Sequence, residues 1–126
     1  EQLDYRYAEG KWNLRELMIH VIDAERVFSY RALRFGRGDT TPLAGFDQDD
    51  YGANVYGTSR GMDSILEEYQ AVRLSTIKLY ENFDEKALAV VGMASDAPVT
   101  TKAIGYITLG HNLHHRLGIE ENYLKG

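Results

Sequence analysis

Apolar residues recur every three or four positions in three separate stretches of the chain, a spacing typical of amphipathic helices. The stretches are 13–35, from Ser59 or Asp63 to Asn82, and from Thr100 or Thr101 to about Tyr123. Strict alternation of apolar and polar residues, the pattern of a half-buried strand, does not occur over a comparable length. Helices separated by loops favour an all-α fold, so we predict a helical bundle. Three long helices are one fewer than the usual four.

The ends of the predicted helices carry capping and stop signals. Asn13 stands immediately before the first stretch and Glu16 follows three residues later, which is the arrangement of a capping box. Gly36 ends this helix, and the polar loop behind it contains Asp47, which can cap a short helical turn extending to about Val55. The connection between the second and third long helices is predicted to be irregular.

The composition limits the fold to one unit and excludes several classes of function. A chain of 126 residues with 44% apolar and 26% charged residues is expected to form one globular domain, 1–126. The formal net charge of −5 has the wrong sign for a phosphate backbone, so nucleic acid is not an expected partner. No stretch approaches the ~18 apolar residues of a membrane span, and the first residues do not resemble a signal peptide. We therefore expect a cytoplasmic protein without membrane contact.

The four histidines are the most informative polar residues. One, His20, lies in the first predicted helix, whereas His111, His114 and His115 fall within five residues of the third. At 100° per residue, His111 and His115 lie about 40° apart on one face, one turn above the other, so both imidazoles can point at one atom. The chain has no cysteine, so histidine, carboxylate or water must supply any metal ligands. A catalytic zinc-type site uses about three protein ligands, and His20 is the candidate for the third.

Each of these histidines also has a structural interpretation. A His-x-x-x-His pair is a weak motif by itself, because half-buried histidines commonly serve in hydrogen bonds without metal. His114 falls with Ile107 and Leu117 in the middle of the apolar stripe of its helix and is the more structural of the four; as a ligand it would replace His111 or His115. Asp23, one turn from His20, can orient an imidazole through a hydrogen bond, or it can pair with an arginine in solvent.

Three longer motifs resemble one known family. The chain contains G-K-W-x-x-x-E-x-x-x-H ending at His20, the loop R-G-D-x-T-P-x-x-G-F-D-Q, and G-H-x-x-H-H near the C-terminus. Together they resemble the DinB-like superfamily of metalloenzymes over nearly the whole chain. The resemblance implies a four-helix bundle, usually dimeric, in which His20, His111 and His115 hold a divalent ion, nickel or zinc. The family's first helix precedes the G-K-W motif and has no counterpart here, so the resemblance predicts an N-terminally incomplete bundle whose apolar stripes need a neighbouring chain.

The resemblance also suggests two types of reaction. Some members use a low-molecular-weight thiol such as bacillithiol, so we expect a thiol S-transferase or a hydrolase acting on a small-molecule substrate. For a transferase, Arg31 or Arg34 beside His20 can hold the carboxylate or sugar hydroxyls of the thiol, although both can instead pair with Glu16, Asp23 or a neighbouring helix. The alternative is a non-catalytic, dimeric helical bundle whose histidines are structural or bind metal adventitiously.

Overall fold

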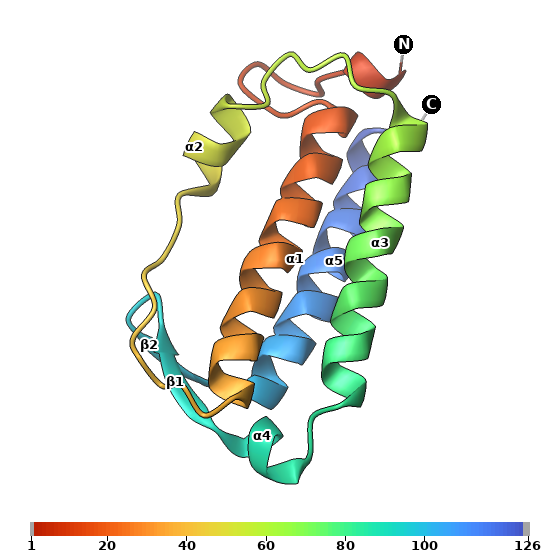
Figure 1. Cartoon of the computed structure of the whole chain (residues 1–126). Coiled ribbons are helices and arrows are strands. Elements are labelled where there is room, and N and C mark those ends of the chain that lie inside the picture. The colour runs from red at the N-terminus through yellow and green to blue at the C-terminus, as the bar shows by residue number, and fades with distance from the viewer. Residues whose placement is uncertain (1, 125–126) are drawn as a thin grey trace.

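Three long helices dominate the computed structural model, which describes residues 2–124 (Figure 1). They are α1 (Leu14–Gly36), α3 (Met62–Glu81) and α5 (Thr101–Asn122). In Figure 1, α1 and α3 run in the same direction and α5 runs in the opposite direction. The shorter elements are the 3-10 helix η1 (Gln2–Asp4), α2 (Gln48–Ala53), α4 (Glu85–Ala89), β1 (Val91–Ala94) and β2 (Ala97–Thr100). The predicted helical fold is confirmed.

The helix ends follow from the capping residues. Asn13 precedes α1, its side chain accepts a hydrogen bond from the backbone N–H of Glu16, and the Glu16 side chain accepts one from the backbone N–H of Asn13. The predicted capping box is therefore present. Asp47 caps α2 by accepting from the N–H groups of Asp49 and Asp50, as expected for the short turn. The bounds of α3 and α5 lie within two or three residues of the prediction.

A β-hairpin occupies the connection that the sequence pattern leaves irregular. Strands β1 and β2 pair antiparallel, with Val91 opposite Thr100 and Ala94 opposite Ala97. The two turn residues, Ser95 and Asp96, have φ of 51° and 63°, the left-handed conformation that two-residue hairpin turns require. The strands have four residues each, which is too short for a clear alternation, and the turn lacks the glycine that normally marks such a hairpin.

The core lies around α1, which packs against both α3 and α5. Near the hairpin, Phe35 is fully buried with Ile104 and Phe83. Toward the other end of α1, Ile22 packs on Ile65 of α3. Because α1 contacts both partners along its length, it fixes which residues of α5 face residues of α1.

The face of α5 that is buried differs from the apolar stripe inferred from its sequence. Ile104 and Thr108 are 3% exposed, whereas Ile107 and Leu117, in the predicted stripe, are 46% and 54% exposed.

Within residues 2–124, no helix has both the length and the apolar character that crossing a bilayer would demand.

Candidate metal centre

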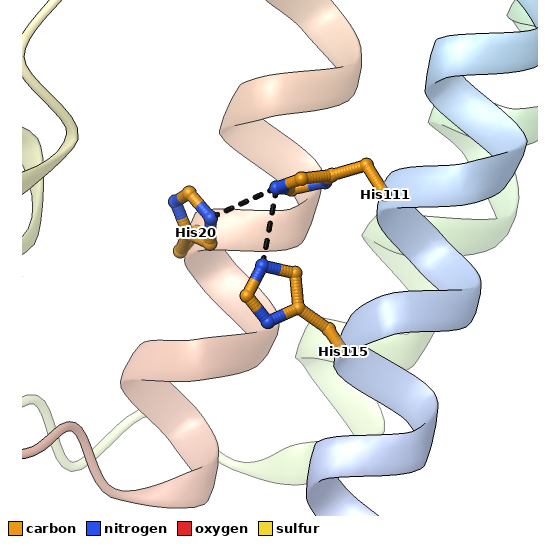
Figure 2. A group of neighbouring side chains, drawn as sticks. All are labelled: His20, His111 and His115. Carbon is orange, nitrogen blue, oxygen red and sulfur yellow. Dashed lines mark hydrogen bonds between the residues drawn. The ribbon is translucent and has the colours of Figure 1, made fainter.

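Three histidines converge between α1 and α5 (Figure 2). Nε2 of His20 lies 3.2 Å from Nε2 of His111, and Nε2 of His111 lies 3.1 Å from Nε2 of His115. One nitrogen from each ring lies within 4.8 Å of the other two. The structure thus brings together the two sequence-distant groups of histidines that the spacing and the resemblance singled out.

Aromatic rings hold two of these imidazoles in place. The indole of Trp12 lies against His20, with ring centroids 4.6 Å apart and planes inclined by 38°. Phe28, two turns beyond His20 on α1, meets the His111 ring edge to face at 5.6 Å. Aromatic rings therefore pack against His20 and His111, and His20 is only 5% exposed.

Burial sets the protonation state of the cluster. It lowers the pKa of His20 to about 4, with the neighbouring His111 adding to the shift. Burial also lowers the pKa of His115 to about 4, and it lowers the pKa of His111. Desolvation disfavours the imidazolium form, so all three rings are neutral at pH 7 and offer lone pairs. Neutral imidazole is the form that binds metal ions.

The donor set also fits a single ion in its spacing. Imidazole nitrogens bind zinc-type ions at about 2.0–2.1 Å, and two ligands in a tetrahedral arrangement at that distance lie about 3.3 Å apart. The observed separations of 3.2 Å and 3.1 Å are close to this value. Within residues 2–124 the cluster consists of three histidines without a carboxylate, which matches a borderline-soft divalent ion rather than calcium or magnesium, because those two prefer oxygen.

A cavity of about 510 Å³ opens beside the cluster. His115 lines it, together with residues of the N-terminal segment, the start of α2 and the last turns of α5. Among the residues that the structure describes, Lys11, Asp49 and Glu121 are the charged ones in its lining. This size is typical of sites for small molecules.

Of the other predicted pocket residues, only His114 lines this cavity. Its ring is exposed and lies 5.0 Å, centroid to centroid, from that of His115. Arg31 extends instead toward the hairpin, where it donates to the carbonyl of Ala44 and to Oγ of Ser95. The structure therefore places Arg31 outside the group of histidines.

Asp23 lies on α1 but does not reach the imidazoles. Among residues 2–124, no hydrogen bond joins its carboxylate to His20. The pKa of Asp23 is raised overall, because the effects of burial and of the nearby Glu68 carboxylate exceed the opposing effect of Arg26. Its neighbours are thus charged groups of α1 and α3. Arg34 is engaged away from the histidines, but its partners are Asp39 and the hydroxyl of Tyr30, to which it donates, rather than Glu16, Asp23 or a neighbouring helix.

A buried polar cluster next to the centre has no counterpart among the predicted site residues. The Glu25 carboxylate accepts hydrogen bonds from Arg73 and Thr76 of α3 and from Asn112 of α5. Asn112 directly follows His111, so this cluster fixes the rotation of α5 that points His111 toward α1. In the sequence, the only sign of this cluster is Glu25 itself, which follows Ala24 on the buried side of α1. Tertiary contacts alone distinguish it from a surface glutamate.

One of three comparisons with known proteins found a match. A family model described as the DinB superfamily matches residues 1–119. No curated protein and no solved structure matches the chain.

Proposed function

Because the chain belongs to the DinB superfamily, we propose that it is a metal-dependent enzyme that holds one divalent ion, nickel or zinc, with His20, His111 and His115. The observation that supports this most directly is the convergence of three neutral imidazole nitrogens from α1 and α5 at one point (Figure 2). A second support is the cavity that gives His115 access to a small molecule.

The chain's own residues suit chemistry on a small thiol or on water. An ion in such a site acts as a Lewis acid and favours the deprotonated form of a bound thiol or water. The protein has no cysteine, so a transferred thiol would come from a second small molecule. Lys11 lines the cavity, and it can hold the carboxylate of such a molecule. His114 lies on the same wall and can exchange a proton with a substrate there. We propose a thiol S-transferase or a hydrolase.

Metal analysis tests the site. Protein purified without a histidine tag should carry close to one equivalent of Ni²⁺ or Zn²⁺ after incubation and dialysis, and His111→Ala should lose most of it. His114→Ala is the matched control and should retain the metal, because its ring lies outside the triad. Equal low metal in all three proteins would contradict the proposal.

A substrate screen tests the enzyme. The metal-loaded protein should accelerate either the reaction of a low-molecular-weight thiol with an electrophile or the hydrolysis of an activated ester or amide. The acceleration should disappear in His111→Ala. Lys11→Ala should raise the KM for a carboxylate-bearing thiol more than it lowers kcat. A metal-loaded protein that accelerates none of these reactions supports the non-catalytic alternative instead.

One surface favours self-association, which both interpretations allow. Exposed apolar side chains form a stripe along α5 and just past its end; its members are Tyr106, Leu109, Leu113, Leu117 and Leu124. Two copies of α5 packed antiparallel about Leu113 would place Lys102 of each copy near the acidic Glu120 and Glu121 of the other. We propose a homodimer through this stripe.

The dimer has a direct test because the chain is free of cysteine. Leu113→Cys, next to the proposed twofold axis, should cross-link under mild oxidation, whereas Leu74→Cys on α3, also about half exposed, should not. Sedimentation should show dimer dissociation in Leu113→Glu. A monomeric wild-type chain would refute the dimer and leave the metal site untouched.

A further inference from the structure

The indole of Trp12 lies between His20 of α1 and Gly52 of α2. One side of the ring faces His20 at 4.6 Å between centroids. On another side is Gly52 of α2, where an added Cβ would come within 2.7 Å of the indole Nε1. Gly52 is buried, and the indole fills the space that a side chain there would need. The indole therefore has little room to move away from His20.

The backbone of Trp12 is fixed as well. Trp12 immediately precedes Asn13, the N-cap of α1, so its main chain is set by the start of the helix. Its carbonyl accepts a hydrogen bond from the hydroxyl of Tyr123, the residue that follows α5. Trp12 is thus attached to α1 and to the end of α5 at once, the two helices that supply the histidines.

In the described part of the chain, no side chain or carbonyl accepts a hydrogen bond from the second ring nitrogen of His20, the contact that usually orients a metal-binding histidine. Such a ring commonly donates its second N–H to a carboxylate or a carbonyl, which fixes the ring plane. Within residues 2–124, the hydrogen bond formed by the His20 ring is that between its Nε2 and His111, and Asp23 does not provide another. Among the described residues, the His20 ring contacts the rings of His111 and His115 and, outside the triad, the indole of Trp12, which restrains the plane of the imidazole from the other side.

We propose that Trp12 is a positioning residue for His20: the indole, braced by Gly52, holds the imidazole with Nε2 directed at His111 and His115. This inference rests on the proposed metal site and assigns to stacking the role that a hydrogen bond plays elsewhere. Aromatic stacking restrains the ring plane without taking up either ring nitrogen. Trp12 also lines the cavity, so it shields one face of His20 from the solvent there.

Two substitutions of different kinds test the role. Trp12→Ala removes the stacking partner and should weaken Ni²⁺ binding by about 10-fold or more, the usual effect of losing an orienting neighbour. Trp12→Phe keeps a flat ring against His20 and should recover most of the affinity. Tyr30→Ala, which removes an exposed aromatic ring from α1 ten residues beyond His20, is the control and should leave affinity unchanged.

Gly52→Ala tests the same contact from behind without altering any residue that touches His20. Alanine is the better helix former, so this change should not weaken α2 by itself. Its Cβ must displace the indole, and Ni²⁺ affinity should fall. Gly110→Ala in α5, where an added Cβ meets nothing within 4 Å, is the matched control and should bind Ni²⁺ as the wild type does. Circular dichroism of each variant verifies that the helices are retained.

Fluorescence tests independently whether the indole lies beside the bound ion. Trp12 is the chain's single tryptophan, and an open-shell ion such as Ni²⁺ quenches the emission of a neighbouring indole. Emission should fall as Ni²⁺ is added, reach its end at one equivalent, and stay constant in His111→Ala.

The possible failures are distinguishable. Wild-type protein without His111-dependent Ni²⁺ binding would refute the metal site and this inference with it. Wild-type protein that binds Ni²⁺, while folded Trp12→Ala and Gly52→Ala bind it equally well, would refute the positioning role alone. If Trp12→Ala does not fold, Trp12→Phe and Gly52→Ala decide the matter, because an unchanged affinity in folded Gly52→Ala contradicts the proposal.

Discussion

At the scale of single residues, the Glu25 carboxylate is 2% exposed and depends on Arg73 for its charge balance. Burial alone would raise its pKa, but hydrogen bonds from Arg73, Thr76 and Asn112 keep the pKa of Glu25 below its usual value. Arg73→Met should therefore destabilise the protein by about 3 kcal/mol, because it leaves a buried charge unpaired. Arg116→Met, which breaks a solvent-exposed pair with Glu120, should cost less than about 0.5 kcal/mol. Urea denaturation of both variants measures the difference, and equal losses would contradict the argument.

At the scale of elements, the hairpin and the end of α1 use the same left-handed backbone with different residues. Asp96 has φ of 63° and Gly38 has φ of 82°. Asp96→Gly should raise the free energy of unfolding by up to about 1 kcal/mol, because glycine adopts this conformation without steric cost. Gly38→Ala should lower the free energy of unfolding by about 1 kcal/mol, because alanine is strained in this conformation. An added Cβ at Gly38 meets no neighbour within 4 Å, so a steric clash does not contribute. Thermal unfolding should show melting temperatures shifted in opposite directions; a shift in the same direction would be inconsistent with backbone strain.

At the scale of the whole molecule, buried titratable groups join the segments and make the metal-free fold acid-sensitive. Burial opposes ionisation of Glu16, yet hydrogen bonds from Arg6 and the backbone of Gly57 lower the pKa of this carboxyl overall. Its stabilising effect is present above about pH 4.5 and is lost as the pH falls. His20 and His115, whose pKa values lie at about 4, stay neutral in the folded chain while their unfolded forms take up protons below about pH 6.5.

Both effects have the same sign, so the free energy of unfolding should decrease steadily from pH 7 to pH 4. Urea titrations at several pH values measure this dependence. His111→Ala, which removes one of the three imidazoles, should show a shallower decrease between pH 6.5 and pH 4.5. A stability that stays constant over this interval would contradict the burial of neutral histidines.

Local sequence patterns predict the long helices because their signals lie within a few residues. The capping box at Asn13 and Glu16 and the cap at Asp47 are contacts between positions two or three apart, and the structure shows both. The hairpin was not predicted, since four-residue strands give no clear alternation and the turn residues Ser95 and Asp96 are unusual there. The same locality explains why His111 and His115 were recognised as a pair on one helical face.

By itself, the sequence determined the helices, their caps and the spacing that puts His111 and His115 on one face. These features depend on the 3.6-residue period of the α-helix and on contacts between residues a few positions apart. Only the tertiary structure decided which face of α5 is buried, that His20 meets the pair, and that Trp12 stacks on it while Arg31 turns away. These relations depend on how α1 and α5 rotate against each other. The Glu25 cluster and the packing of Ile22 and Phe35 fix that rotation through contacts between residues distant in the chain.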